Sequence, residues 1–396
     1  MNIALCHESV LPERGGCETY IADLARRLIA DRHEVHLYAC HRDESSLPAQ
    51  LRFHALPAVR APRFLRPWLF GRRCLQALAA RRHDLTVGFH RLWGLDILYP
   101  QGGLHAASAE QNVLKHAGRI RRGIARFAKS IDLAHWSFRR LERRMYLGGY
   151  PTQVLVNSEM VRHHFASYLK ISPDRIKLIH SAVDSARFPQ HDRLRRRQEG
   201  RESWGLAPAD IAGLFVAKNY RLKGLSPLLH AVAAMLQRPE FRGAPPPFRL
   251  LVCGNDRTRN YEGLAARLGI APHVRFVGQF ADIRTAFFSA DFLVHPTFCD
   301  PCSLVVLEAL ACDLPVITSH YNGASELMHP LQEGFVIDDP HDHAHLGWCL
   351  AQMLDPARRR ACAQAARRTA SQWTFEHHYR QLVQAFQEVI ERKQAA

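Results

Sequence analysis

Short apolar runs alternate with helical stretches twice along this 396-residue chain, and that alternation limits the possible fold more than any other feature. Runs of Val, Ile, Leu and Phe that are separated by helices are typical of parallel sheets covered by helices on both faces. The sequence therefore predicts an α/β protein with two Rossmann-like, doubly wound domains that face a cleft. We predict strands over residues 2–6, 34–38, 51–55, 85–88, 97–99 and 153–156, and then over 213–217, 249–253, 274–277, 292–295, 315–318 and 334–337.

The net charge of +16 is concentrated in one part of the chain. Residues 51–150 hold 19 Lys and Arg against 5 Asp and Glu, a local charge of +14, interleaved with large apolar side chains such as Phe127 and Trp136. Such a mixture suits docking on anionic lipid headgroups, with aromatic rings entering the interface. A solvated face, a site for an acidic soluble substrate and a nucleic-acid surface are the alternatives. Because no zinc-finger, helix-turn-helix or ribonucleoprotein signature accompanies the charge, we expect no nucleic-acid partner.

Export, a membrane span and a bound metal all lack support in the sequence. Met1 leads directly into an apolar strand, and no apolar run reaches the ~18 residues that a spanning helix needs. The ten cysteines are scattered, which favours free thiols in a reducing compartment. Cys299 and Cys302 form a C-x-x-C pair near Cys312, but no fourth ligand is apparent, so we expect neither metal nor cofactor. We therefore predict a cytoplasmic protein.

Two carboxylates eight residues apart, Asp300 and Glu308, lie in the segment that is most informative for function. Asp300 falls in a turn after the strand over 292–295, and Ser303 is placed as the N-cap of an apolar helix that contains Glu308. The unpaired N–H groups at a helix N-terminus favour an anionic oxygen. An ordinary amphipathic helix with two acids near its start is the alternative interpretation.

This segment resembles the Glu-x7-Glu motif of the retaining glycosyltransferases of family 4, which have the GT-B fold. The resemblance implies that Asp300 contacts hydroxyls of the donor sugar and that Glu308 holds the nucleotide ribose. It also implies that backbone amides of Ser303, Leu304 and Val305 reach the donor. Asp replaces the usual first Glu and is shorter by one methylene, roughly 1.3–1.5 Å of reach, which puts the identity of the donor sugar in question.

A second segment, over residues 214–232, resembles the Gly-Arg-x4-Lys-Gly motif with which the family binds the donor diphosphate. Ala217 and Lys218 stand at the Gly-Arg positions, and Lys223 stands at the Lys position. Lys218 offers a point charge in place of the planar fork of Arg. Fixed cations together with helix amides would stabilise the departing diphosphate without a metal. Two solvated lysines beside a strand end are the alternative.

Two further matches concern the donor. Gly15 and Gly16 lie between the first strand and the first helix, where glycines let backbone amides approach a diphosphate. They resemble the Gly-Gly loop of the family. Phe280 follows the strand over 274–277, in the segment with which the family holds the nucleobase. An ordinary strand–helix loop and a core aromatic ring are the alternatives.

The segment over residues 87–108 resembles the matching part of the lipopolysaccharide-core glucosyltransferases, which add glucose to a heptose. Gly102 and Gly103 occupy the place where those enzymes carry polar residues, often an Asp, near the acceptor. His105 follows closely and is a candidate for contact with the transferring sugar. A loop histidine without a role in transfer is the alternative.

The resemblance as a whole implies an acceptor-side domain over residues 1–172, a nucleotide-sugar domain over 173–375, and a helix over 376–396 that packs back on the first domain. It implies metal-independent transfer of a hexose from a nucleotide-diphosphate sugar, for which UDP is the expected nucleotide. The acceptor would be a cell-envelope glycan or glycolipid, such as lipopolysaccharide core, at the inner face of the cytoplasmic membrane. Asp300, Lys223 and His105 are the predicted catalytic residues. A nucleotide-sugar epimerase and a non-catalytic protein that binds sugar nucleotides or anionic surfaces remain the alternatives.

Overall fold

The computed structural model describes residues 1–12, 15–150, 152–241, 243–279, 282–329 and 331–395. It divides the chain into two compact units, Met1–His180 with His377–Ala396, and Ser181–Glu376. The first division falls after His180 rather than after residue 172, because a strand over Ile176–Leu178 completes the first sheet. Each unit is an α/β domain built on a parallel sheet, and this fold class confirms the prediction.

The first unit is built on a seven-stranded sheet in the order β5-β3-β1-β6-β7-β8-β9. Its strands are β1 (Asn2–Cys6), β3 (Glu34–Ala39), β5 (Arg52–Ala55), β6 (Leu85–Gly88), β7 (Ile97–Leu98), β8 (Gln153–Val156) and β9 (Ile176–Leu178), and a separate pair is formed by β2 (Ser9–Val10) and β4 (His41–Arg42). Its helices are α1 (Gly16–Ala30), α2 (Arg66–Ala79), α3 (His105–Leu114), α4 (Arg119–Ser130), α5 (Leu133–Leu147), α6 (Glu159–Leu169) and α14 (Phe375–Ala395). Neighbouring strands are parallel, and all four residues of β8 are buried, which explains why the strands read as continuous apolar runs.

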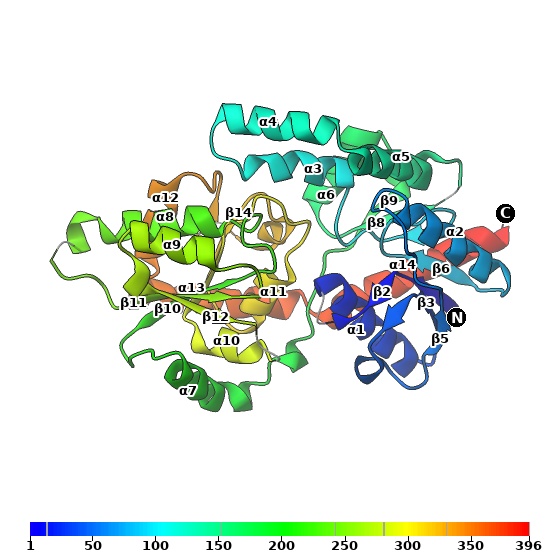
Figure 1. Ribbon diagram of the computed structural model, residues 1–396. Coiled ribbons are helices and arrows are strands. Elements are labelled where there is room, and N and C mark those ends of the chain that lie inside the picture. The colour runs from blue at the N-terminus through cyan, green and yellow to red at the C-terminus, as the bar shows by residue number, and fades with distance from the viewer. Residues whose placement is uncertain (13–14, 151, 242, 280–281, 330, 396) are drawn as a thin grey trace. The chain divides into compact units, whose positions relative to one another are not determined.

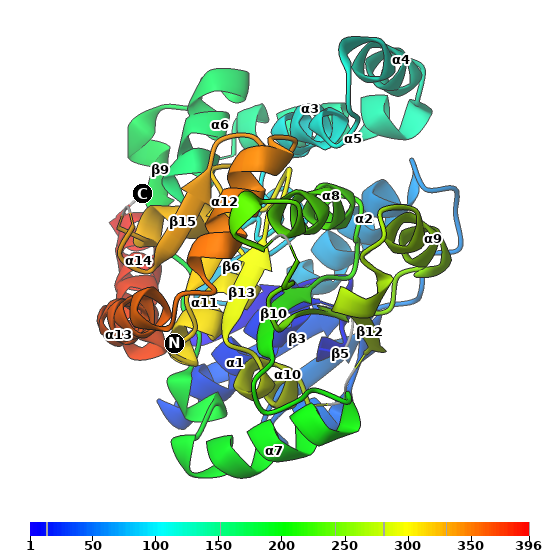
Figure 2. The same ribbon diagram turned by 90° about the vertical axis from the view of Figure 1, so that its left-hand side faces the viewer.

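The second unit is built on a six-stranded parallel sheet in the order β12-β11-β10-β13-β14-β15. Its strands are β10 (Ile211–Val216), β11 (Phe248–Cys253), β12 (Val274–Gly278), β13 (Phe292–His295), β14 (Val316–Ser319) and β15 (Gly334–Ile337). Its helices are α7 (Arg193–Ser203), α8 (Leu225–Leu236), α9 (Arg259–Arg267), α10 (Arg284–Ser289), α11 (Leu304–Ala311), α12 (His343–Gln352) and α13 (Pro356–Gln372). Helices α8 and α12 cover one face of this sheet, and α10, α11 and α13 cover the other (Figures 1 and 2).

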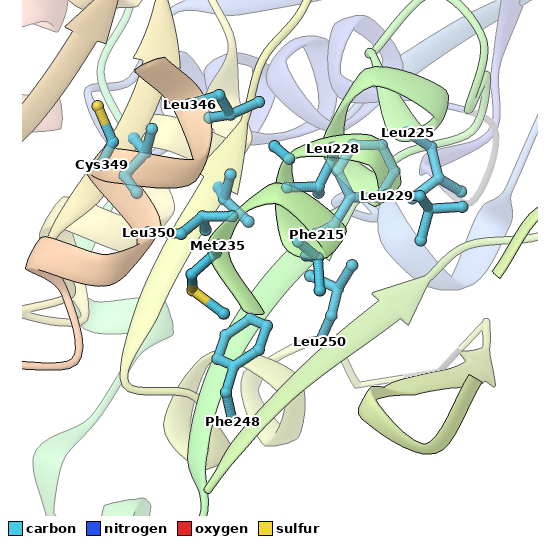
Figure 3. Close-up of a cluster of buried hydrophobic side chains, with 14 of the residues drawn as sticks. Phe215, Leu225, Leu228, Leu229, Met235, Phe248, Leu250, Leu346, Cys349 and Leu350 are labelled. Atoms are coloured by element: carbon cyan, nitrogen blue, oxygen red, sulfur yellow. The ribbon is translucent and has the colours of Figure 1, made fainter. Parts of the chain in front are cut away.

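One core of the second unit lies between its sheet and the α8–α12 pair. Phe215 of β10 and Phe248 of β11 meet Met235 of α8, with Leu346 and Leu350 of α12 alongside, and all five side chains are buried (Figure 3). Burial of one such side chain stabilises a fold by about 1.5–3 kcal/mol. This packing fixes the strands whose carboxyl ends carry the loops described below.

Helix α14 packs against the first unit, although it follows the second unit in the chain. The Nδ1–H of His378 donates to the carbonyl of His180 at 2.7 Å, and its Nε2 accepts from the Tyr20 hydroxyl at 2.7 Å. Near the other end of the helix, Lys177 pairs with Glu388 at 2.7 Å and Lys393 with Asp96 at 2.9 Å. These contacts tie the helix to α1, to β9 and to the residue that precedes β7. Within the described ranges, no helix has the length and apolar character that a bilayer span requires.

Candidate active site

The loop from Pro296 to Ser303 follows β13 and is bound to its neighbours by several hydrogen bonds. The Thr297 carbonyl accepts from the Ser319 hydroxyl at 2.5 Å, and the Thr297 hydroxyl donates to the Cys299 carbonyl at 3.1 Å. The Phe298 amide donates to the Leu222 carbonyl at 2.9 Å, which joins this loop to the one between β10 and α8. The carboxyl ends of β10, β13 and β14 thus come together, as expected for adjacent parallel strands.

Asp300 of this loop forms an ion pair with Lys223 of the loop before α8, and the sequence predicted that both act at one site. The Lys223 ammonium lies 2.5 Å from Oδ2 of Asp300 and also donates to the Cys299 carbonyl at 3.1 Å. His295 Nε2 lies 3.6 Å from the same carboxylate oxygen. Burial opposes ionisation of Asp300, but the ammonium of Lys223 and the neighbouring His295 outweigh it, and the pKa of Asp300 falls well below its usual range. Asp300 is therefore ionised at any physiological pH.

Gly224 explains how Lys223 reaches Asp300. Gly224 has a φ of 85°, and a Cβ at this position would lie 2.1 Å from the Pro296 carbonyl oxygen. Only glycine combines this conformation with so close an approach. The start of α8 can therefore lie against the Pro296–Ser303 loop, which brings Lys223 to Asp300. Lys218 begins the same loop with an exposed side chain, whereas Lys223 is largely buried.

The N-terminus of α11 differs from the prediction at Ser303. Ser303 is the N-cap residue, but its side chain makes no capping bond, and its amide donates to Oδ1 of Asn322 at 3.1 Å. The same oxygen accepts the Ala324 amide at 3.1 Å. Because Asn322 already binds the Ser303 amide, the donors left in the first turn of α11 are those of Leu304, Val305 and Val306, which have no acceptor within the helix.

The sequence did not predict that Asn322 contributes to this site. It is completely buried and donates through Nδ2 to the Thr318 hydroxyl at 3.0 Å, so it ties β14 to the start of α11. The only local signal was the Asn322–Gly323 dipeptide, which is typical of a turn. Nothing in the spacing indicated that its side chain crosses to another loop.

Glu308 lies one turn into α11 and is nearly buried. Its Oε1 is 4.0 Å from a guanidinium nitrogen of Arg187, which belongs to a short 3-10 helix over Ser185–Arg187. A carboxylate held near a half-exposed guanidinium can accept from hydroxyls of a bound molecule. The sequence predicted Glu308 but gave no signal for Arg187.

Cys299 and Cys302 flank Asp300 as buried, free thiols. Burial raises the pKa of Cys302 to about 12, so its thiol stays protonated. In the part of the chain that the structure describes, no three His, Cys, Asp or Glu side chains converge as metal ligands would. Phe280, the predicted nucleobase contact, lies outside the described residues.

Gly15 and Gly16 stand at the start of α1 in the first unit. Gly15 is extended, with φ of 171°, so its backbone conformation does not demand glycine. A Cβ on Gly15 would lie 2.8 Å from Oε2 of Glu18, and its carbonyl accepts the Thr19 hydroxyl at 3.1 Å. Glycine here leaves room for the Glu18 carboxylate beside the start of α1.

His105 begins α3, and its ring lies among other rings and cations of the first unit. Nε2 of His105 is 3.2 Å from Nδ1 of His135, and the Phe138 ring stands edge-on at a centroid distance of 5.2 Å. Burial, with the nearby Arg91 guanidinium, lowers the pKa of His105 to about 4. The imidazole is therefore neutral near pH 7 and able to accept a proton or a hydroxyl hydrogen.

Glu142 of α5 supports this histidine and was not predicted. Its buried carboxylate accepts the backbone amides of His105 and Ala106, the latter at 3.2 Å, and so caps α3 from a neighbouring helix. Burial raises the pKa of Glu142 to about 7, although both amides act against the rise. The sequence gave no signal for it, because Glu142 lies in an arginine-rich stretch that suggests a solvated helix.

Two family models match the chain, and they divide it at almost the same place as the two structural units. Residues 196–369 match the family model of glycosyl transferases group 1, and residues 14–187 match the model of glycosyltransferase family 4. Among curated proteins, the chain is 23% identical over 371 residues to lipopolysaccharide glucosyltransferase WaaG of Escherichia coli strain K12, covering 93% of this chain and 94% of that protein.

Two solved structures extend the comparison. The crystal structure of WaaG, a glycosyltransferase involved in lipopolysaccharide biosynthesis, matches with a TM-score of 0.77 and 23% identity, over 93% of this chain and 95% of that one. Anabaena Alr3699/HepE in complex with UDP-glucose matches with a TM-score of 0.70 and 17% identity, over 98% and 99%. At these identities the likeness shows the shared fold.

Proposed function

Because the chain is a family 4-type glycosyltransferase with the GT-B fold, we propose that it moves a hexose, with retention, from a nucleotide-diphosphate sugar to a cell-envelope glycan or glycolipid. Lipopolysaccharide core is the favoured acceptor, since WaaG is a lipopolysaccharide glucosyltransferase. UDP is the favoured nucleotide, since HepE binds UDP-glucose. The observation that carries the proposal is the Lys223–Asp300 pair beside the N-terminus of α11.

The donor fits this place by charge and by hydrogen bonding. A diphosphate would take the Lys223 ammonium and the amides of Leu304 and Val305, which favour an anion at a helix N-terminus. Asp300, ionised and acceptor-only, would bind hydroxyls of the sugar, and Glu308 those of the ribose. A fixed ammonium and helix amides stabilise the charge that develops on the leaving diphosphate. Transfer without a metal stays a prediction of this arrangement.

We propose transfer on the front face of the sugar. The acceptor hydroxyl forms the new glycosidic bond as the bond to the diphosphate breaks, and a phosphate oxygen of the leaving group takes the hydroxyl proton. His105, neutral near pH 7, would accept a hydrogen bond from a hydroxyl of the transferring sugar. Gly102, whose absent side chain leaves open space, would leave room for the acceptor where related enzymes carry a polar residue.

The first unit also carries a surface that suits the predicted contact with an anionic membrane. Helix α4 has no buried residue. Ile120, Ile124, Phe127 and Ile131 share one face of the helix, since they are spaced by four, three and four residues. Together with Leu133 and Trp136 of α5, these side chains are 60–81% exposed. The basic residues on the same helix are Arg119, Arg121, Arg122, Arg126 and Lys129.

An anionic lipid surface fits both halves of this pattern. Basic side chains attract the headgroups, while apolar side chains enter the boundary with the acyl chains. A hollow of about 410 Å³ between α3 and α4 adds to the fit, because Ile124, Ala125 and Ala128 line it beside Arg121 and Lys129. We propose that α4 docks the enzyme on the inner face of the cytoplasmic membrane, where a lipid-linked acceptor would be met.

Three arginines of the basic region outside α4 already have partners within the chain. Arg66 of α2 pairs with Glu8 at 2.5 Å, and Arg73 donates to the Pro57 carbonyl at 2.8 Å. Arg63 lies over the Phe138 ring at 5.6 Å. On α4, Arg122 and Lys129 likewise donate to backbone carbonyls, those of His116 and Ala109. The other basic residues of α4, which are Arg119, Arg121 and Arg126, are therefore the better candidates for headgroup contact.

Nucleotide release by the purified protein tests the transferase proposal. A panel of UDP-, GDP- and ADP-sugars would be incubated with and without an envelope glycolipid extract, beside Glu308→Ala. Release that requires the extract and disappears in the variant is the expected result, and it would identify the donor. Conversion of the donor sugar without any acceptor would support an epimerase instead. Nucleotide binding without release from any donor would support a non-catalytic protein.

A further inference from the structure

His295 is a buried histidine that the proposed chemistry does not use. It ends β13 and is 1% exposed, and among the described residues neither of its ring nitrogens has a hydrogen-bond partner. Its ring stacks on Phe215 of β10 at a centroid distance of 6.0 Å, and its carbonyl accepts the Thr318 hydroxyl of β14 at 3.0 Å. Buried polar side chains almost always have partners, so an unpartnered imidazole in a candidate active site needs an explanation.

The position of His295 relative to one carboxylate oxygen supplies that explanation. Oδ2 of Asp300 is 2.5 Å from the Lys223 ammonium and 3.6 Å from Nε2 of His295. The second distance exceeds a hydrogen bond by about 0.5 Å. In this structure Lys223 is the hydrogen-bond partner of Oδ2. A small movement would bring Nε2 of His295 within hydrogen-bond distance of the same oxygen.

Donor binding would change this balance. If the diphosphate draws the Lys223 ammonium toward itself, as the proposed function requires, Asp300 becomes a buried carboxylate without its counter-ion. Lys223 and Asp300 are the charged groups that act on His295, one disfavouring its protonated form and the other favouring it. When the Lys223 ammonium moves away, the Asp300 carboxylate has the larger effect and favours the protonated form of His295.

We propose that His295 is a positioning residue that replaces Lys223 as the partner of Asp300 when the donor diphosphate binds, taking a proton from solvent as it does so. The inference rests on the proposed donor site. The proton ends on the imidazole, Nε2–H donates to Oδ2 of Asp300, and the carboxylate stays fixed for the sugar hydroxyls. Burial, which lowers the pKa of His295 in the free protein, agrees with a neutral resting state.

Calorimetric titration of UDP tests the proposal without any transfer reaction. The heats are measured at pH 7 in buffers of different ionisation enthalpy, which reports protons taken up per UDP bound. We expect uptake of roughly half a proton in the natural protein and none in His295→Gln, which keeps a neutral donor toward Asp300 but cannot be protonated. UDP binding without proton uptake in the natural protein would overturn the inference and leave the donor site standing.

A second measurement works without a ligand. In Lys223→Met the ammonium is gone, so the titration of His295, assigned by its absence in His295→Gln, should move upward by about one pH unit in NMR spectra. An unchanged titration in a folded Lys223→Met variant would overturn the exchange of partners. Absence of any binding heat with UDP would instead count against the proposed donor site, and the inference would fall with it.

Discussion

The Asp300 loop of the second unit and the α4 surface of the first unit use charged groups in opposite ways. Asp300 and Lys223 are largely buried and contact each other at 2.5 Å. Their two loops are joined by the bond from the Phe298 amide to the Leu222 carbonyl, and the Ser319 hydroxyl donates to the loop of Asp300. Helix α4 instead carries its basic residues beside apolar side chains that nothing in its own unit buries. The difference matches the two proposed roles, because the groups proposed to act on a small substrate are held in place, and those proposed to dock on a membrane are exposed.

The largest expected effect follows from Asp300→Ala. Loss of one preorganised charged group at a reacting centre typically lowers kcat by about 10²–10³-fold, and we expect a loss near the upper end. Asp338→Ala is the control, because Asp338 is a fully exposed aspartate of the same unit and should keep activity within about two-fold. Steady-state assays with the donor that the nucleotide-release panel identifies measure kcat for both variants. Equal rates for Asp300→Ala and the natural protein would remove Asp300 from the site.

Replacement of Gly224 tests whether the loop is as tightly determined as its contacts indicate. Gly224→Ala combines a positive φ with a Cβ 2.1 Å from a carbonyl oxygen, so we expect a loss of about 3 kcal/mol in the free energy of unfolding. Gly205→Ala is the matched control, since Gly205 has φ of 64° but open space around its Cβ, and it should lose about 1 kcal/mol. Urea unfolding followed by circular dichroism compares the two. Similar losses would mean that the close approach to Pro296 is easily relieved.

Vesicle binding tests whether the exposed side chains of α4 dock on an anionic membrane. Simultaneous change of Ile120, Ile124 and Phe127 to Ser should weaken binding to phosphatidylglycerol vesicles by about 10²-fold, because three apolar side chains no longer enter the interface. The control is Leu194→Ser on the arginine-rich helix α7, which removes an equally exposed apolar side chain from the second unit. Co-sedimentation with phosphatidylglycerol and phosphatidylcholine vesicles gives the affinities. Binding that survives in the triple variant would rule out α4 as the docking element.

The smallest expected effect concerns pH and the first unit. Burial lowers the pKa of His378 to about 4, below the 6.5 of an exposed histidine. The unfolded chain therefore binds the proton more readily, so the contribution of this histidine is present above pH 6.5 and lost as the pH falls toward 4. We expect the natural protein to lose about 2 kcal/mol more between pH 7 and pH 4.5 than His378→Gln does. Urea unfolding at both pH values measures the difference, and equal losses would contradict the assignment.

The sequence was sufficient for most strands of the two main sheets and for the residues with a regular spacing, but it did not predict β2, β4 and β9. Val, Ile and Leu runs predicted the strands because parallel strands are buried on both faces, and the spacing of Asp300 and Glu308 located both on one loop–helix unit. Helix α4 was not predicted, although Ile120, Ile124 and Phe127 have helical spacing. Its arginines and apolar side chains were interpreted only as a surface for anionic lipid.

The missed residues share a physical reason. Asn322, Arg187 and Glu142 act across elements that are distant in sequence, and each contact depends on how loops or helices pack. The amide of Ser303 was predicted to serve the donor, but Asn322 binds it, which no local pattern could reveal. Periodicity reports which face of an element is buried, and it does not report which distant side chain meets an orphan amide.

Helix α14 has a consequence for the order in which the protein forms during synthesis. The first sheet is translated early, but His378, Glu388 and Lys393, which close its contacts to α1, β9 and the Asp96 region, emerge only after the whole second unit. The second unit can therefore reach its native packing first, while the first remains open at one side. Contacts between residues so far apart in sequence form slowly, so we expect the last contacts of the first unit to form after the packing of the second unit.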